Sequence, residues 1–408
     1  MKALVLCGGI PQIALLQDLK RRGITTVLAD MNEAVAGRAY TDIFYPTSVL
    51  DVEGVKEVAI KEKVDFIITV CADQVLLVVA EVSEMLGLPC YIDHKTAVDV
   101  SNKICMKTVF RDNGIPTSKF VITEALDPED IKDLKYPLIV KPVDSYSSRG
   151  VAKVTSYEEL VPAFANAVKI SRTNNAIVEE FVEGDEISVD VYVENGKAHV
   201  LCSSNLDKIG EGGKFIIHRT VNPANVSSIV EEKIEKVAQG IADAFGLKDS
   251  PMLIQMIVSG DDVSVVEFCA RTGGGDKFRL IEKVSGFDVV GAVADITLGI
   301  KPHYEKKDIR KEYIINEFLY CNPGVFDHLE GFEELLADGI ITEYFQLKTK
   351  GVEFKEINSS GDRVAYFTVQ AYSREEALAK HAEANKRIKA VDAEGKDLIR
   401  HDLVAKIG

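Results

Sequence analysis

The sequence predicts a multidomain α/β protein, on three observations. Its 408 residues exceed the size at which a single core stops growing, about 250–300 residues, so about two or three domains are expected. Short apolar runs alternate with amphipathic stretches over residues 1–95, which is typical of a parallel sheet wound with helices. Apolar residues make up 46% of the chain and charged residues 27%, as in ordinary folded domains and unlike disordered chains.

Residues 1–95 are expected to form a Rossmann-like domain. The expected strands are Ala3–Cys7, Thr25–Ala29, Asp65–Val70 and Pro89–Ile92, and the expected helices are Ile10–Arg22, Val52–Lys63 and Gln74–Leu86. The first strand ends in Gly8-Gly9 and the second in Asp30, as in dinucleotide-binding folds. Pro11 and Gln12 stand where the three-glycine fingerprint would continue, so the layer is expected to be structural, without a NAD site.

Residues 96–305 are expected to form the central domain, with a lid at about residues 117–183. A helix over Thr96–Asn113 opens the domain and carries Lys103 and Lys107 on one face, because they are four residues apart. The lid is expected to contain strands Phe120–Thr123, Leu138–Pro142, Val151–Val154 and Ala176–Val182 with a helix at Tyr157–Lys169. The rest is expected to contain strands Ile187–Val193, Ala198–Ser203 and Lys214–Thr220, a helix at Ser227–Phe245, and a hairpin of Met252–Val258 with Val263–Phe268.

Residues 306–408 are expected to form a small, strand-rich C-terminal domain. The charged segment 301–312 is a candidate linker leading into it. Its expected helix, Ser373–Ile388, has Ser373 as N-cap and Glu376 at the third helical position. No catalytic residue is assigned to this domain.

Charge and cysteine usage exclude several classes of function. The formal net charge of −16 repels phosphate backbones and anionic lipids, so no nucleic-acid or membrane partner is expected. The seven cysteines include no CxxC pair, as in a reducing compartment, and the seven histidines show no zinc-binding spacing. The N-terminal apolar run stops at Gly8-Gly9, far short of the roughly 20 residues of a membrane span. A cytoplasmic protein is expected.

Two segments of the lid have the chemistry of a nucleotide site. Lys141 ends an apolar strand and is followed by a polar loop, Asp144–Gly150, and a lysine beside hydroxyls and backbone N–H groups suits a phosphate. An exposed hairpin loop is the alternative for this segment. Val178–Glu186 sets carboxylates around an apolar pair, which suits the edge of an adenine and a ribose, with a solvated acidic turn as the alternative.

The later hairpin carries a second group of candidate residues. Gln255 and Glu267 would lie on one face if the turn pairs them, because side chains alternate along strands. A buried carboxylate costs several kcal/mol without a compensating cation, and Mg²⁺ with its preference for oxygen is the natural candidate. Arg271, followed by Gly273–Gly275, would place a guanidinium and a closely approaching backbone beside that metal, as for a phosphate or carboxylate.

In this order, over roughly residues 1–300, these motifs resemble the ATP-grasp superfamily. The motifs are Asn102-Lys103, Lys141-Pro142 with its polar loop, Glu179–Val182 with Gly184 and Glu186, and Gln255 followed by Glu267–Gly274. The carboxylate–amine ligases, including amino-acid ligases, and the ATP-grasp halves of carbamoyl-phosphate synthetase are the most similar branches. The resemblance implies an ATP-grasp fold with an N-terminal Rossmann-like pre-ATP-grasp domain, a lid subdomain, a central antiparallel sheet and a small C-terminal domain.

The resemblance also implies a role for each matched residue, with ATP and Mg²⁺ (or Mn²⁺) as cofactors. ATP would be held by Lys103 and Lys141 at the phosphates, by Ser145, Ser147, Ser148 and Gly150 in a mobile phosphate loop, by Glu179, Glu180 and Val182 at adenine, and by Glu186 at ribose. The metal would bind Glu267 and Gln255, and Arg271 with Lys141 would be catalytic. The acid pocket would lie near residues 203–218 and 271–279.

The implied reaction joins a small carboxylate, such as an amino acid, to an amine through an acyl phosphate. A homodimer is the assembly expected of this family. Three departures from the family pattern keep alternatives open: Gln255 replaces an acid, Cys269 replaces an asparagine, and the phosphate loop is rich in serine instead of glycine. The alternatives are a kinase of the carbamoyl-phosphate type and a catalytically degenerate, ATP-binding sensor or scaffold.

Overall fold

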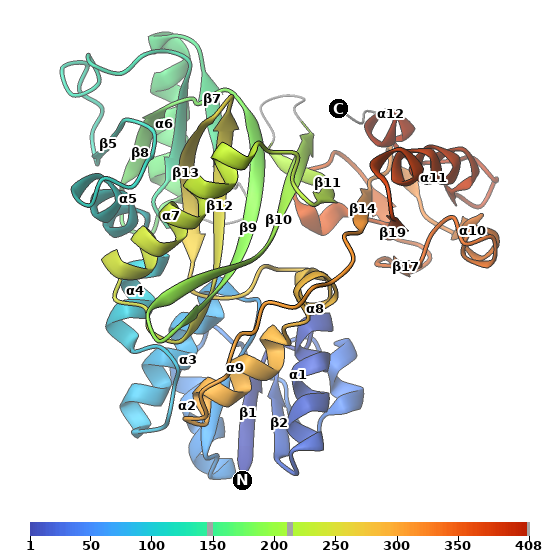
Figure 1. Cartoon of the computed structure of the whole chain (residues 1–408), viewed down its shortest axis with the longest axis horizontal. Helices are drawn as coiled ribbons and strands as arrows, with labels where there is room; N and C mark the ends of the chain where they lie inside the picture. Colours follow the sequence, from blue (N-terminus) through green and yellow to red (C-terminus); the bar gives the residue numbers. More distant parts are fainter. Residues whose placement is uncertain (145–149, 210–214, 406–408) are drawn as a thin grey trace.

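The computed structural model describes residues 1–144, 150–209 and 215–405. The described residues form three larger sheets and two two-stranded sheets. Figure 1 shows the N-terminal sheet at the bottom, the lid at the upper left and the C-terminal part at the right. The central sheet lies between these three parts. Within the described ranges, none of the helices combines the length and the apolar run that a membrane crossing needs.

The N-terminal sheet is the predicted parallel layer. Its strand order is β3-β2-β1-β4, and every pair is parallel. The strands are β1 (Lys2–Leu6), β2 (Thr25–Ala29), β3 (Ile43–Tyr45) and β4 (Phe66–Ile68), and the helices are α1 (Ile10–Arg21), α2 (Val52–Glu62) and α3 (Asp73–Leu86). The strand expected at Pro89–Ile92 is wrong, since this segment is irregular, and Pro89 has no N–H to donate to a ladder.

The single helix expected over Thr96–Asn113 is also wrong, because the structure divides it into α4 (His94–Ser101) and α5 (Lys103–Asp112). Asn102 between them is extended, with φ −95° and ψ 110°. Its side-chain oxygen accepts from the N–H groups of Ile104 and Cys105, at 2.8 and 3.3 Å, so a new helix begins there. Lys103 is therefore the first residue of α5.

The lid is a four-stranded antiparallel sheet with strand order β5-β8-β6-β7. Its elements are β5 (Phe120–Thr123), β6 (Leu138–Pro142), β7 (Ala152–Val154), α6 (Tyr157–Ile170) and β8 (Ala176–Glu180). Helix α6 packs against β6 through a small core of its own that includes Leu160 and Phe164. The predicted lid elements lie within two residues of these bounds.

The central sheet has eight strands, in the order β13-β12-β9-β10-β11-β14-β19-β17, and all neighbours are antiparallel. The strands are β9 (Asp185–Glu194), β10 (Lys197–Ile209), β11 (Ile216–Asn222), β12 (Ser250–Ser259), β13 (Asp262–Cys269), β14 (Tyr313–Leu319), β17 (Glu343–Gln346) and β19 (Ala365–Ala371). Strands β14, β17 and β19 come from residues 306–408, so the sheet continues across the expected boundary at residue 305. The three domain ranges themselves stay predictions.

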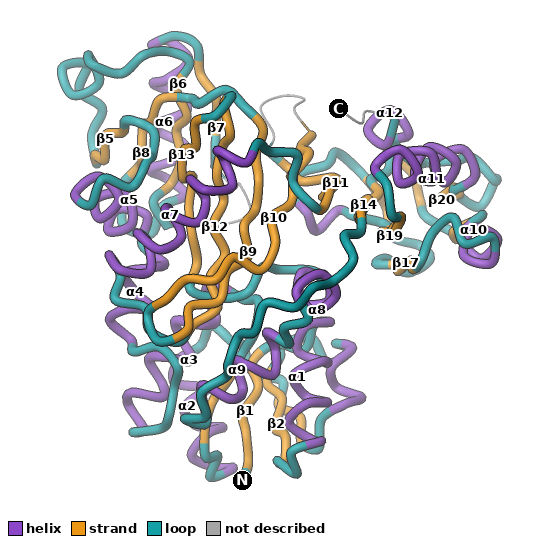
Figure 2. Tube along the Cα trace, viewed as in Figure 1, coloured by secondary structure: helices purple, strands orange, loops and turns teal. Residues whose placement is uncertain are grey.

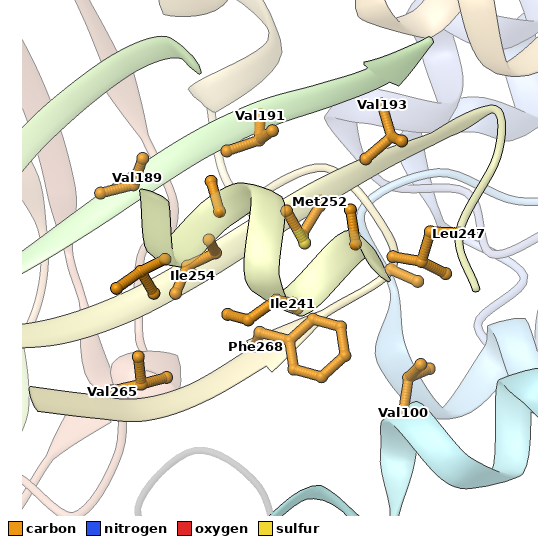
Figure 3. Close-up of a cluster of buried hydrophobic side chains, with 14 of the residues drawn as sticks. Val100, Val189, Val191, Val193, Ile241, Leu247, Met252, Ile254, Val265 and Phe268 are labelled. Carbon is orange, nitrogen blue, oxygen red and sulfur yellow. The ribbon is translucent and has the colours of Figure 1, made fainter. Parts of the chain in front are cut away.

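One face of the central sheet buries the main core against α7 (Ser228–Ala244). Figure 3 shows Val189, Val191 and Val193 of β9 on this face, with Ile241 of α7 close to Phe268. Burial of each such side chain is worth about 1.5–3 kcal/mol. Because strand side chains alternate, the residues between these valines project from the opposite face.

Helices α8 (Lys277–Ser285) and α9 (Val289–Thr297) follow the β12–β13 hairpin and pack in one core with β1 and α1 of the N-terminal sheet. The C-terminal region adds α10 (Phe332–Ala337), α11 (Arg374–Arg387) and α12 (His401–Val404). Four short strands complete it as the two two-stranded sheets, β15 (Gly324–Val325) with β18 (Glu353–Phe354) and β16 (His328–Glu330) with β20 (Lys389–Val391). The linker at 301–312 is irregular and runs from α9 to β14 (Figure 2). It passes the β9–β10 hairpin, where His303 Nδ1 lies 2.7 Å from Glu194 Oε1.

Candidate active site

A cavity of about 570 Å³ lies between the lid and the central sheet, and it collects most of the predicted site residues. Nine of them line it: Lys103, Lys141, Glu179, Glu180, Val182, Glu186, Gln255, Glu267 and Arg271. Ser145, Ser147 and Ser148 lie outside the described residues. Gly150 has φ +78°, and a Cβ there would come within 2.8 Å of Ile170 and 2.9 Å of Pro142, so this position requires glycine.

Two lysines and one glutamate form a buried cluster on the lid side of the cavity. Lys141 Nζ lies 2.6 Å from Glu179 Oε1, and Lys107 Nζ lies 2.7 Å from Glu179 Oε2. Ser118 donates to the same carboxylate at 2.8 Å. Burial raises the pKa of Glu179, but the two lysines outweigh it and hold this pKa at about 2. The carboxylate is therefore ionised and fixes the position of Lys141.

For Lys107, burial outweighs the attraction of Glu179 in setting the pKa. Burial lowers the pKa of Lys107 to about 8, and neighbouring Lys141 adds to the effect although Glu179 opposes it. Its ammonium also donates to Thr117 at 2.6 Å and to Ser118 at 3.1 Å. Sequence spacing indicated only that Lys107 shares a face with Lys103, and its role as the second partner of Glu179 depends on contacts across the fold.

Lys103 and Glu267 form a second ion pair, in the cavity wall. Their Nζ and Oε2 atoms are 3.1 Å apart, and 31% of the Glu267 side chain is exposed, on the cavity side. The pKa of Glu267 is lowered, chiefly by Lys103 against the effect of burial. The Lys103 ammonium therefore already lies beside the carboxylate that was expected to bind Mg²⁺.

The hairpin pairs Gln255 with Glu267, as predicted, and a β-bulge sets which way they point. The register runs Gln255 opposite Glu267 and then Met256 opposite Val265, so Val266 is the extra residue. The bulge resets the alternation, and both Val265 and Phe268 are therefore buried in the main core while Glu267 faces the cavity.

The Gln255–Glu267 pair fits a magnesium ion that is shared with a ligand. Gln255 Nε2 donates to Glu186 at 3.2 Å, which leaves its amide oxygen as an acceptor beside the Glu267 carboxylate. Mg²⁺ in nucleotide sites commonly takes one or two protein oxygens, with phosphates and water completing its shell. Over residues 1–144, 150–209 and 215–405, no group of three or more His, Cys, Asp or Glu side chains is arranged to hold a metal. These two residues supply the donor set for a partial site.

Arg271 is held by a residue that sequence reasoning missed. Its Nε and Nη2 donate to the two oxygens of Asp73, the first residue of α3 in the N-terminal domain. Asp73 lies at the carboxyl end of the parallel sheet, shortly after β4, which is where ligands meet such sheets. That topological rule is the one sequence signal for Asp73. The contact itself joins residues 198 positions apart.

The C-terminal region contributes to the cavity wall, although none of its residues was among the predicted site residues. Asn316, Phe318, Ser360 and Arg363 line it. Arg363 lies over the Phe318 ring, 3.8 Å from its centre, and donates from Nε to the Tyr320 hydroxyl at 3.0 Å. The cavity therefore extends from the nucleotide motifs to a region where a second substrate has room.

The expected acid pocket contains Asp276 and Lys277 in the wall. Burial raises the pKa of Asp276 to about 6, although Arg279 lowers it, and Tyr366 donates to its carboxylate. Lys277 Nζ donates to Ser204 at 2.9 Å and lies 3.4 Å from Asp190. Described residues of the two predicted segments thus come together in the cavity wall, from β10, β11 and the stretch that leads into α8. Residues 210–214 of the first segment lie outside the described residues.

Comparisons with known proteins agree with this architecture. A model of the ATP-grasp domain matches residues 134–278, and a model of the L-amino acid ligase C-terminal domain 2 matches residues 317–392. A formate-dependent phosphoribosylglycinamide formyltransferase from Wolinella succinogenes is 26% identical over 234 residues. That match covers 56% of this chain and 59% of the relative, so the chain spans less than two thirds of that relative's length.

Two solved structures share the fold over nearly the whole chain. The L-amino acid ligase from Bacillus licheniformis has a TM-score of 0.83 at 20% identity, covering 96% of this chain and 98% of that chain. The biotin carboxylase domain dimer of 2-oxoglutarate carboxylase from Hydrogenobacter thermophilus, bound to MgADP, ADP and bicarbonate, has a TM-score of 0.76 at 18% identity. It covers 98% of this chain and 91% of that chain. These likenesses establish the fold.

Proposed function

Because the chain belongs to the ATP-grasp superfamily, we propose that it is an ATP-dependent carboxylate–amine ligase. It joins an amino acid or another small acid to an amine and releases ADP and phosphate. The observation that carries this proposal is the convergence of Lys103, Lys141, Glu267 and Arg271 on one cavity. The match to an L-amino acid ligase C-terminal domain supports an acid substrate of amino-acid size.

The proposed roles are those that the ATP-grasp resemblance implies, and the shared cavity supports them. Lys103 and Lys141 bind the phosphates of ATP, with Lys141 held in place by Glu179. Glu180 and Val182 bind adenine, and Glu186 binds the ribose. Glu179 accepts from the amino group of adenine and stays paired with its two lysines. Gln255 and Glu267 hold Mg²⁺, or Mn²⁺ in its place. The phosphate loop comprises Ser145, Ser147, Ser148 and Gly150.

The proposed reaction has two steps. A carboxylate oxygen attacks the γ-phosphorus of ATP, the bond to the β–γ bridging oxygen breaks, and ADP leaves with that electron pair. The bound metal ion would neutralise charge on the phosphates. Lys141 and Arg271 offset the negative charge of the transferring group and of the acyl phosphate. The amine nitrogen then attacks the acyl carbon, phosphate leaves, and the nitrogen gives up a proton to water.

ADP and phosphate release from ATP–Mg²⁺ across a panel of single and paired amino acids, with product masses, tests the proposal. We expect release that depends on one acid, and a new amide mass only when an amine is added. Release with bicarbonate alone would favour the carbamoyl-phosphate type of kinase, an alternative that the bicarbonate-bound structural neighbour keeps in view. ATP binding without release for any acid would contradict the ligase and favour the sensor or scaffold.

Three further expectations remain part of the proposal. The protein is placed in the cytoplasm, it acts on small molecules with neither nucleic acid nor membrane as a partner, and it works as a homodimer. The dimer named for the Hydrogenobacter thermophilus neighbour supports the last of these. Light scattering of the purified chain tests it.

A further inference from the structure

The contact between Asp73 and Arg271 joins the N-terminal domain directly to the reactive end of the cavity. Arg271 follows β13 of the central sheet, and Asp73 opens helix α3 after the parallel sheet. Both residues line the cavity, but to different extents: 12% of the Arg271 side chain is exposed and 37% of the Asp73 side chain. The guanidinium is therefore nearly enclosed while one of its partners remains open to the cavity.

Some N–H groups of the Arg271 guanidinium donate to the protein, and the others have no protein partner among the described residues. A guanidinium has five N–H donors. Nε and Nη2 donate to the two Asp73 oxygens, and Nη1 donates to the Thr272 carbonyl oxygen at 2.7 Å. This leaves one donor on each Nη atom without a partner among the described residues. Those two form a pair suited to an anionic oxygen of a ligand.

Asp73 is itself held by its surroundings. Burial raises the pKa of Asp73, but Arg271 outweighs burial and keeps it below its ordinary value. The nearby Cys269 side chain, at the position that departs from the family pattern, is also among the groups that lower the pKa of Asp73. Two residues earlier, Cys71 has φ +60°, a strained backbone conformation for a residue with a Cβ.

A neighbouring contact fixes the same loop without touching the guanidinium. The Tyr91 hydroxyl donates to the Ala270 carbonyl oxygen at 3.0 Å. Tyr91 also comes from the segment after the parallel sheet, so two side chains of residues 1–95 hold two consecutive residues of the loop after β13. The two contacts differ in kind, since one orients a side chain and the other orients only the backbone.

We propose that Asp73 is a positioning residue for Arg271: it binds one edge of the guanidinium and aims the remaining donors at the phosphoryl group and the acyl phosphate. The proposal rests on the proposed ligase function. Asp73 does not touch the reacting atoms, and its effect on turnover passes through Arg271. Small displacements of such a group cost about 10²-fold in rate, because alignment is lost while binding elsewhere is kept.

The test is a double-mutant cycle with Asp73→Asn and Arg271→Lys, measured as ADP release with the acid that wild type prefers. We expect Asp73→Asn to lower kcat by about 10–10²-fold. Its KM for ATP should change by less than about 3-fold, because the adenine and ribose groups lie elsewhere in the cavity. Asp73→Glu keeps the charge, so its kcat should fall less than that of Asp73→Asn. When Arg271→Lys is already present, adding Asp73→Asn should lower kcat little further.

Tyr91→Phe is the matched control, because it removes the other contact to the same loop. If Asp73 acted only by holding the domains together, Tyr91→Phe and Asp73→Asn would lower kcat alike, and the inference would be overturned. Full kcat in a folded Asp73→Asn protein would overturn it too, as would additive losses in the cycle. If Asp73→Asn does not fold, Asp73→Glu decides: kcat and KM for ATP equal to wild type would count against the inference. An absence of acid-dependent release in wild type would instead refute the ligase function.

Discussion

Glu267 and Glu317 are both glutamates on strands of the central sheet, but their surroundings differ. Glu317 is completely buried on β14, with His218 Nδ1, His381 Nε2 and the Arg219 guanidinium around its two oxygens. Glu267 on β13 has Lys103 beside it and the cavity in front of it. A buried carboxylate whose oxygens are all taken by donors of the protein, like that of Glu317, stabilises the fold. A carboxylate that faces a cavity, like that of Glu267, has room for a ligand.

The cluster around Glu317 also joins separate parts of the chain. Arg219 of β11 donates through Nη2 to the Val404 carbonyl oxygen at 2.7 Å, at the end of α12, and His381 comes from α11. Glu317 has its pKa lowered, because the two histidines and Arg219 outweigh burial. None of these four side chains is among the described residues that line the cavity, and their contacts fasten the C-terminal helices to the central sheet.

Glu267→Gln gives the largest expected effect on turnover. The change removes the charge from the proposed metal site while keeping the shape, so ADP release should fall by at least about 10²–10³-fold. The thermal unfolding midpoint should change little, because the cavity face hydrates the amide. Lys141→Ala should also abolish release. Full turnover in both variants would contradict the site.

Glu317→Ala should lower the stability of the fold and leave turnover nearly unchanged. Removing this carboxylate takes away the acceptor that Arg219 shares with two buried histidines, although Arg219 keeps its ion pair with Asp207. Breaking such a buried pair costs about 3–5 kcal/mol of stability. Below the new unfolding midpoint, turnover per folded molecule should stay close to that of wild type. Urea unfolding followed by circular dichroism measures the loss, with Glu375→Ala on the exposed face of α11 as the control. Equal losses in the two variants would refute the comparison.

Asp276→Asn should have a smaller effect that depends on pH. The folded-state pKa of about 6 exceeds the ordinary 3.8, so the folded protein binds the proton more tightly and loses stability as pH rises through this window. The variant should therefore be more stable than wild type by about 1–3 kcal/mol at pH 8, and the difference should disappear by about pH 4. Unfolding curves at both pH values test this, with the exposed Asp133→Asn as the control. A difference that is the same at both pH values would contradict it.

The sequence predicted the parts of the site that depend on local pattern. The pairing of Gln255 with Glu267 follows from alternation around a tight turn, and Lys141 follows from its place at the end of an apolar strand. Asp73 and the partners of Glu317 could not be predicted, because they meet across separations of 64 to 198 residues that no local pattern encodes. The break at Asn102 was missed because capping by its side chain outweighed the periodicity of the surrounding residues.

The extent of the central sheet could not be predicted either. Strand β14 pairs with β11, far earlier in the chain, and thereby draws Asn316 and Phe318 into the cavity wall. The sequence indicated that residues 306–408 contain strands, but a strand pattern does not tell which other strand each of them pairs with. The C-terminal domain at 306–408 stays a prediction, and the charged segment 301–312 runs from α9 to β14 of the central sheet.

The most direct test of the central claim follows oxygen atoms. If a carboxylate attacks ATP at the cavity where Lys141, Glu267 and Arg271 meet, one oxygen of the acid must leave in the phosphate. With oxygen-18 in both positions of the carboxylate, mass spectrometry should find one labelled oxygen in each phosphate released by wild type together with the amide product, and no labelled phosphate with Glu267→Gln. Unlabelled phosphate released alongside labelled amide would contradict the acyl phosphate, and with it the proposed use of the cavity.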